Sequence, residues 1–436
     1  MALTGRTALL AALGALVVAL LPGWHGVLTV ALVLLAAVVL DLALAAPVRT
    51  LRFSRSGTTT VRLHEEAPVE LTVSNPSGRL LVADLRDAWP PSSWQPGTAF
   101  DASRHRVRVP GGERTRVTTT LCPTRRGDHE AVRVTVRAYG PLGLAARQGS
   151  HEVPWTVRVL PRFGSRKHLP SKLARLRELD GRTSVLTRGE GTEFDSLREY
   201  VPGDDVRSID WRATARQTTV AVRTWRPERD RHLLLVLDTG RTSAGRVGDV
   251  PRLDASMDAA LLLTALASQA GDRVDLLAYD RQVRARVRGR TGAEVLPAVV
   301  RAMAPLEPAL IETDTGALAA ATLAGAPRRS LIVLFTGLDT GAVESGLLPV
   351  LPRLALRHTV IVAAVGDPRI EEMARKRGSV EAVYQAASAS RYEAERQHTV
   401  ARLKAHRNVT VVEAPPEDLA PAVADAYLAL KTAGKL

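Results

Sequence analysis

The sequence has a single cysteine, Cys122, among 436 residues, and only 4% of its residues are aromatic. One cysteine excludes an internal disulfide and suits a reducing compartment. Three enzyme patterns are also missing: a G-x-x-x-x-G-K-[ST] loop, an H-E-x-x-H helix and a G-x-G-x-x-G turn after a strand. Ser, His and Asp residues are present, but no local pattern groups them into a triad. We therefore expect no enzymatic activity and no cofactor beyond, at most, a weakly held Mg²⁺.

Negative charge is scarce relative to positive charge, with 45 acidic against 59 basic residues and a net charge of +14. The excess arginines are dispersed along the chain, and no basic patch is interleaved with aromatic residues. We expect no nucleic-acid partner. Attraction to anionic lipids at a cytoplasmic membrane surface accounts for the excess.

Long apolar runs occur near the N-terminus. Residues 7–22 carry no charge, a Gly-Trp-His-Gly turn occupies 23–26, and residues 27–46 form a second run broken only by Asp41. Because a span needs about 20 such residues, the segment 1–50 predicts a transmembrane helical hairpin. The first run is also short enough for the core of a signal peptide, but no small-x-small cleavage pattern follows it.

Basic residues flank this pair of runs. Arg6 precedes it, and Arg49, Arg52 and Arg55 follow it. The positive-inside rule therefore places both termini and all later domains in the cytoplasm, on the cell (inner or plasma) membrane. Asp41 lies about a turn and a half from the inner end, and we expect its carboxylate to snorkel to the interface.

Residues 57–161 show a period of two. Val69, Leu71 and Val73 alternate with Glu70 and Thr72, the pattern of a half-buried antiparallel strand. About seven such runs are separated by turn residues rich in Pro and Gly. The pattern predicts a small all-β sandwich of the immunoglobulin type.

Residues 232–436 follow a different pattern. Apolar runs alternate with helical segments, which predicts a doubly wound α/β domain with a mostly parallel sheet. The runs lie at 233–238, 274–280, 330–337, 359–366 and 409–415, and the helical segments at 254–270, 292–303, 315–324, 343–356, 368–405 and 417–433. Since such sheets bind ligands at the carboxyl ends of their strands, we expect a site just after residues 237 and 336.

The first of these runs ends in Asp238-Thr239-Gly240-Arg241-Thr242-Ser243. This loop resembles the metal-ion-dependent adhesion site of von Willebrand factor A domains, D-x-S-x-S, in which a carboxylate and hydroxyls ligate Mg²⁺. Asp238 and Thr242 match the pattern, whereas Gly240 has no ligand to offer. Thr313 corresponds to the family's later threonine, and Asp339 is the nearest acid after Thr336-Gly337-Leu338. Each lost oxygen weakens a site for a hard cation, so we expect a degenerate, weak site.

Residues 165–231 form a charged connector with a helical piece near 170–179 and a dense motif after it. One interpretation is that Arg–carboxylate pairs lock one domain against another. The other is a recognition surface, anchored by aromatic and arginine side chains. The motif residues are Phe194, Arg198, Tyr200, Gly203, Asp204, Asp205, Arg207, Asp210, Trp211 and Arg216.

The run from Phe194 to Arg216 resembles the signature of the bacterial domain-of-unknown-function 58 family, membrane-anchored proteins with a von Willebrand factor A-like domain. Asn75-Pro76 and Arg125-Arg126-Gly127 agree with it, as does Gly140-Pro141-Leu142-Gly143-Leu144, which departs from the usual D-P-x-G-L at Gly140. The resemblance implies a MoxR-type AAA+ ATPase as partner and a role in the maturation of envelope or other complexes.

Two kinds of function compete. The missing catalytic signatures favour a membrane-anchored adaptor that binds proteins. The alternative is a metal-dependent hydrolase with its site at Asp238, for which Asp314 and Asp339 would be the nearby acids.

Overall fold

The computed structural model describes residues 2–20, 23–186, 193–201, 204–216, 219–226, 231–290 and 292–435. The chain divides into two compact units, Met1–Arg162 and Phe163–Leu436.

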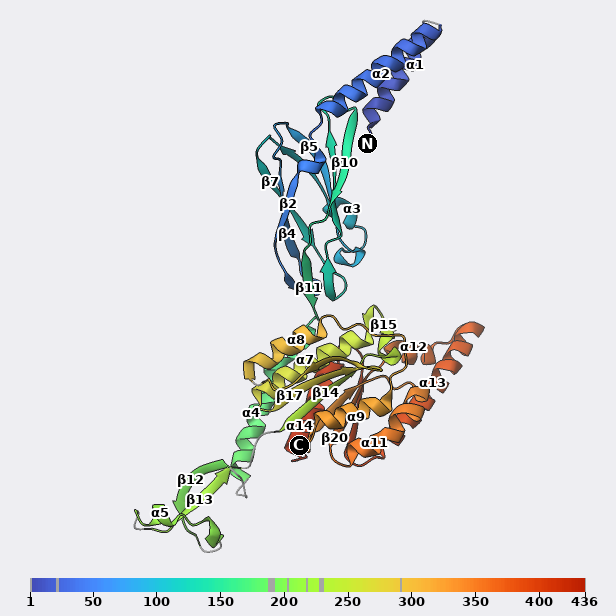
Figure 1. The fold of residues 1–436 in the computed structure, drawn as a ribbon. Coiled ribbons are helices and arrows are strands. Elements are labelled where there is room, and N and C mark those ends of the chain that lie inside the picture. Colours follow the sequence, from blue (N-terminus) through green and yellow to red (C-terminus); the bar gives the residue numbers. More distant parts are fainter. Residues whose placement is uncertain are drawn as a thin grey trace. The chain divides into compact units, whose positions relative to one another are not determined.

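The first unit begins with two apolar helices, α1 (Gly5–Leu20) and α2 (Trp24–Leu44). They lie side by side and project from one end of a β-sandwich (Figure 1). Gly14 permits this approach, since a Cβ there would lie 2.5 Å from Val30 Cγ1. In the described part of the chain, Trp24–Thr50 is the stretch long and apolar enough to cross a membrane, whereas α1 has 16 residues. The first span stays a prediction.

The β-rich region consists of sheets packed face to face. The strand orders are β1-β10-β9-β5-β6, β2-β4-β7 and β3-β11-β8. The strands are β1 (Ala2–Leu3), β2 (Arg52–Gly57), β3 (Thr60–Arg62), β4 (Ala67–Ser74), β5 (Leu81–Ala88), β6 (Arg104–Val109), β7 (Arg114–Leu121), β8 (Gly127–Glu130), β9 (Arg133–Tyr139), β10 (Ala145–His151) and β11 (Thr156–Leu160). A short helix, α3 (Ala99–Ala102), interrupts them. The alternation predicted in β4 is confirmed, because Val69, Leu71 and Val73 are fully buried.

The second unit contains a six-stranded sheet in the order β18-β17-β14-β19-β20-β21. The strands are β14 (His232–Asp238), β17 (Arg273–Tyr279), β18 (Val283–Val287), β19 (Leu331–Phe335), β20 (Thr359–Val365) and β21 (Val409–Ala414). The five predicted strands are parallel, as expected, and β18 adds an antiparallel edge. A small hairpin, β15 (Arg246–Val247) with β16 (Val250–Pro251), lies apart from this sheet.

Helices cover both faces of the sheet (Figure 1). The helices that follow β14 are α6 (Arg241–Ala244), α7 (Arg252–Gln269), α8 (Val295–Met303), α9 (Thr315–Gly325), α10 (Thr340–Ala342), α11 (Leu348–Ala355), α12 (Pro368–Arg375), α13 (Val380–Lys404) and α14 (Leu419–Thr432). The single helix expected over 368–405 is wrong: α12 and α13 are separate, because Gly378 has a φ of +126° and Ser379 caps α13.

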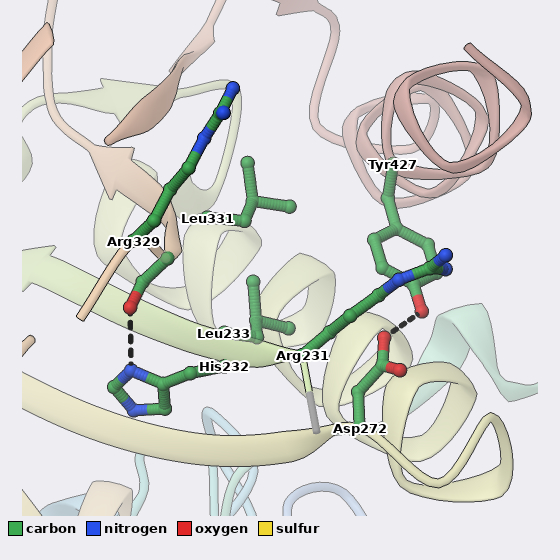
Figure 2. A pocket seen from close by; sticks show the side chains of 8 residues that line it. Arg231, His232, Leu233, Asp272, Arg329, Leu331 and Tyr427 are labelled. Atoms are coloured by element: carbon green, nitrogen blue, oxygen red, sulfur yellow. Dashed lines mark hydrogen bonds between the residues drawn. The ribbon is translucent and has the colours of Figure 1, made fainter. Parts of the chain in front are cut away.

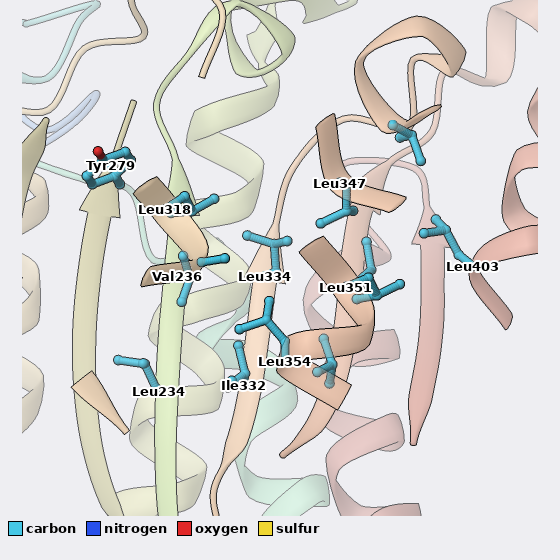
Figure 3. Close-up of a cluster of buried hydrophobic side chains, with 14 of the residues drawn as sticks. Leu234, Val236, Tyr279, Leu318, Ile332, Leu334, Leu347, Leu351, Leu354 and Leu403 are labelled. Atoms are coloured by element: carbon cyan, nitrogen blue, oxygen red, sulfur yellow. The ribbon is translucent and has the colours of Figure 1, made fainter. Parts of the chain in front are cut away.

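A hydrophobic cluster on one face of the sheet joins the strands to the helices that cover them (Figure 3). Leu234 and Val236 of β14 and Leu334 of β19 contribute from the strands, with Leu318 of α9 and Leu351 of α11 above them. Successive strand residues point to opposite faces, so Leu233 and Leu235, both buried, face the side covered by α7. Burial on both faces explains why the strands are continuously apolar.

The predicted connector contains regular structure of its own. It consists of α4 (Leu169–Leu186), the antiparallel pair β12 (Glu193–Glu199) and β13 (Ala221–Arg226), a 3-10 turn at Val206–Ser208 and α5 (Trp211–Thr214). We call β12, β13 and the segment between them the signature hairpin. Sequence analysis anticipated the helix but not the two strands.

Candidate functional site

Asp238 lies at the carboxyl end of the central strand β14 and is 4% exposed. Its Oδ1 accepts hydrogen bonds from the Gly240 backbone N–H (2.8 Å) and from the Thr313 hydroxyl. Its Oδ2 accepts from the hydroxyls of Thr242 (2.9 Å) and Thr336 (2.6 Å). The carboxylate is therefore surrounded by three hydroxyl groups from three different loops.

The structure brings together three of the four predicted metal ligands: Asp238, Thr242 and Thr313. Asp339 lines the same cavity, but its carboxylate faces Arg252, with an Oδ2 to Nη1 distance of 3.5 Å. Thr336 was not among the predicted ligands. The signal that could have found it is its position directly after β19, the strand next to β14 in the sheet.

Gly240, the apparent gap in the adhesion-site pattern, has a structural reason. A Cβ at this position would lie 2.1 Å from the Thr313 hydroxyl oxygen. The hydroxyl of Thr313 thus occupies the space that a side chain at 240 would need. Backbone hydrogen bonds fix this loop to the strand end, from Arg241 N–H to the Ile311 carbonyl (2.8 Å) and from Ala309 N–H to the Thr239 carbonyl (2.7 Å).

Beside this cluster lies a cavity of about 470 Å³. One side is polar, formed by Asp238 and the hydroxyls around it, and the other is apolar, with Leu318, Leu334 and Leu347. Across the described residues, no three His, Cys, Asp or Glu side chains come close enough to share a metal ion. The oxygens around Asp238 that could ligate a hard cation are its carboxylate and the neighbouring hydroxyls. Such a set of ligands carries little negative charge. The cavity therefore suits a ligand that carries a polar group next to an apolar one.

A second polar cluster lies at the same edge of the sheet, beyond Asp339. Arg396 pairs with Glu393 at 2.6 Å and with Glu413, and these side chains adjoin Arg252 and Asp367. Burial raises the pKa of Glu413, although Arg396 opposes this shift. The sequence had not singled out this network.

The opposite edge of the sheet holds a structural cluster (Figure 2). His232 bonds to Ser330 Oγ at 2.8 Å and to Asp275 at 3.0 Å, and the Tyr427 hydroxyl donates to Asp272. Burial raises the pKa of Asp272. The cavity there measures about 20 Å³, room for about one water molecule, so this cluster joins strand starts to α14 rather than binding a ligand.

The charged residues of the signature hairpin are engaged within the hairpin itself. Arg198 donates to Asp204 at 2.5 Å, and Asp205 accepts from the Arg207 backbone N–H at 2.9 Å. Asp210 caps α5 by accepting from the backbone of Arg212 and Ala213, both at 3.0 Å. It also accepts from Arg223 at 2.8 Å. The bond from Ala213 and the one from Arg223 lower the pKa of Asp210.

These pairs change the interpretation of the motif. The ion pairs of Arg198 and Asp210 have their partners within the same hairpin, so they stabilise the hairpin itself. The pairing of one domain with another stays a prediction. What the hairpin presents to solvent is Trp211, 69% exposed, together with the exposed Arg207, Arg212 and Arg216. Tyr200 is partly buried, Gly203 lies outside the described residues, and Phe194 is on β12 with its side chain outside them.

A membrane-capable helix, a β-sandwich and an α/β unit carrying a charged hairpin define the class of this protein. The family model described as "Protein of unknown function DUF58" matches residues 196–414, half of the chain, and the chain belongs to this family. Uncharacterized protein Rv1480 of Mycobacterium tuberculosis is 32% identical over 190 residues, which are 43% of this chain and 59% of that protein. Uncharacterized protein YeaD of Bacillus subtilis is 27% identical over 132 residues, 30% of this chain and 32% of its own length.

Solved structures are similar over a quarter of the chain. The CARDB domain of the PF1109 protein from Pyrococcus furiosus matches with a TM-score of 0.19 and 16% identity, over 25% of this chain and 86% of that domain. A beta-glucosidase from Listeria innocua matches with a TM-score of 0.15 and 18% identity, over 25% of this chain and 16% of its own.

Proposed function

We propose that this protein is a membrane-anchored adaptor in the cytoplasm that binds other proteins through the signature hairpin. The anchor is the α1–α2 pair, with both helices spanning, and the working partner is a MoxR-type AAA+ ATPase in the maturation of a protein complex or of the cell envelope. The partner class comes from the family resemblance. The sandwich is immunoglobulin-like and the α/β unit von Willebrand factor A-like in this proposal.

The exposure of Trp211 carries the proposal. A tryptophan that is 69% exposed keeps a large apolar surface in water, and tryptophan and arginine are the residues enriched at energetically important interface positions. Its position is fixed, because Asp210 caps the helix that Trp211 begins and is itself bonded to Arg223 of β13. The hairpin therefore holds an aromatic anchor and nearby arginines on a small framework of its own, which suits an acidic partner surface.

The test measures binding of the full chain, held in lipid nanodiscs, to the purified MoxR-type ATPase from the same genome. Trp211→Ala should weaken binding by about tenfold or more, because the residue is the proposed centre of the contact. Its melting temperature should not change, since the side chain is exposed. Asp210→Ala should lower both binding and hairpin stability.

The matched control is Tyr384→Ala, which removes an equally exposed aromatic side chain (72%) from α13. It should leave binding unchanged. If Trp211→Ala binds like the wild type, the hairpin is not the docking surface. If Tyr384→Ala alone loses binding, the docking surface is on α13.

A further inference from the structure

The end of α2 is fastened to the sandwich by a buried carboxylate. Asp41 is fully buried, and its oxygens accept hydrogen bonds from the backbone N–H groups of Leu142 (2.7 Å), Leu144 (2.7 Å) and Ala145 (2.9 Å). The partners of this carboxylate are thus backbone amides of the sandwich, which the sequence did not reveal. Gly140 makes room for this carboxylate, since a Cβ there would lie 2.2 Å from Asp41 Oδ1.

The start of α1 is held by the same loop, residues 140–144. The Thr4 hydroxyl donates to the Gly143 carbonyl at 2.7 Å, and the Thr4 backbone N–H donates to the Leu144 carbonyl at 3.0 Å. Leu3 pairs with Ala145 across β1 and β10. Both helices thus begin or end at one loop, and the sandwich is joined to them without a flexible linker.

This attachment fixes how deep the loop lies if α2 crosses a bilayer. Asp41 is three residues from the end of α2 at Leu44, which corresponds to about 5 Å along the helix axis. The polar layer on each side of a bilayer is roughly 5–7 Å thick. The loop bonded to Asp41 therefore lies in the headgroup layer. Leu142 at its tip is 49% exposed, and Leu80 in the neighbouring loop is 42% exposed.

Three arginines surround the same end. Arg79 donates to the carbonyl of Ala43 and, at 3.4 Å, to that of Ala45. Arg147 donates to the Leu42 carbonyl at 3.0 Å, and Arg6 to the Leu142 carbonyl at 3.4 Å. These bonds satisfy carbonyls at the end of α2 and in the loop, but they use few of the five donors of each guanidinium.

None of Arg6, Arg79 and Arg147 forms an ion pair with a carboxylate in the described part of the chain. Their charges are left to solvent at the depth where lipid phosphates lie, beside two exposed leucines. The charge of the three arginines, their depth and the two exposed leucines all favour one occupant of this surface, the lipids around α2.

We propose that this end of the sandwich is a lipid-binding surface for anionic phospholipids of the cytoplasmic leaflet. Arg6, Arg79 and Arg147 bind headgroup phosphates, and Leu80 and Leu142 contact the acyl boundary. The proposal rests on the membrane anchoring described above and is independent of the adaptor role.

The experiment places the full chain in nanodiscs of phosphatidylcholine mixed with phosphatidylglycerol and counts the lipids retained on the protein by native mass spectrometry. The wild type should retain phosphatidylglycerol in excess over its share of the bilayer. The double variant Arg79→Gln/Arg147→Gln should lose this excess by roughly tenfold, since each basic residue near the surface adds to the attraction. Glutamine keeps a donor for the α2 carbonyls, and melting in pure phosphatidylcholine verifies the fold.

The matched control is Arg86→Gln/Arg133→Gln, which removes two exposed arginines from the other end of β5 and β9. It should retain lipid like the wild type. The charge-keeping variant Arg79→Lys/Arg147→Lys should retain most of the excess. Equal retention by the Gln variant and the wild type would overturn the lipid surface while leaving the anchor intact, whereas failure of the wild type to enter nanodiscs would overturn the anchor as well.

Discussion

At Asp238, the carboxylate oxygens already accept four hydrogen bonds from protein donors. A cation there has to compete with these bonds, and the nearby Asp339 faces Arg252, which offsets its charge. Mg²⁺ also gives up its water ligands reluctantly. The geometry therefore supports, at most, weak binding of a metal ion.

We predict that Mg²⁺ binds to the full chain in detergent with a dissociation constant of about 1 mM or weaker. Calorimetric titration of Mg²⁺ and Mn²⁺ measures it, with Asp238→Ala as the variant that removes the site. Asp249→Ala, which removes an exposed carboxylate from the β15–β16 turn, is the control. A micromolar constant that is abolished by Asp238→Ala but not by Asp249→Ala would show that the site is a true metal centre.

A different residue makes the stability of the second unit depend on pH. His358 is 2% exposed, and neither of its ring nitrogens has a hydrogen-bond partner among the described residues. Burial, with help from Arg357 and His232, lowers its pKa below 6.5. The unfolded chain then binds the proton more readily than the folded one between the lowered pKa and about 6.5.

Above pH 6.5, neutral His358 therefore does not lower the free energy of unfolding. As the pH falls through this window, the free energy of unfolding decreases by up to about 1.4 kcal/mol per pH unit. His358→Phe should make thermal unfolding of the second unit less sensitive to acid between pH 7.5 and 5.5. His398→Phe, at an exposed site on α13, should unfold like the wild type at each pH. An unchanged pH dependence in His358→Phe would contradict this assignment.

At the scale of single residues, the sequence predicted Asp238, Thr242 and Thr313 because the loop after an apolar strand keeps a recognisable spacing. Thr336 was missed as a hydrogen-bond partner of Asp238, since this contact depends on β19 lying directly beside β14, a neighbour relation that spacing does not encode. The partners of Asp41 were missed for a similar reason. Its partners are backbone amides about a hundred residues away, and no local pattern reveals them.

Among the elements, those with a buried face were predictable, and those without one were not. The five parallel strands are apolar throughout, whereas β18 has the sequence Val-Arg-Ala-Arg-Val and four of its five residues are not buried. The strands of the signature hairpin are likewise rich in charged residues. β12 and β13 pair with each other in a two-stranded sheet that is separate from the six-stranded one. Pairing of such strands depends on a turn and on ion pairs, which periodicity does not detect.

For the whole molecule, the change of period from two to alternating apolar runs and helices predicted a boundary between an all-β region and an α/β region. The predicted boundary at residues 161–165 agrees with the division after Arg162. The sandwich starts earlier than the expected residue 57, because β2 begins at Arg52, directly after the helices. This short connection is what joins the anchor to the sandwich.

The same connection bears on topology. Thr4 before α1 and Asp41 near the end of α2 bind one loop, so an intact hairpin has both of its ends on one side of the membrane. From the flanking Arg6, Arg49 and Arg52, the positive-inside rule predicts that this side is the cytoplasm. We predict that a reporter fused after Leu436 is active as a cytoplasmic enzyme and inactive as an exported phosphatase, and that a phosphatase fused after Gly26 is active. A phosphatase signal from the Leu436 fusion would reverse the orientation. Activity of the phosphatase at neither position would place Gly26 and Leu436 on the same side, which would mean that α2 does not cross the membrane.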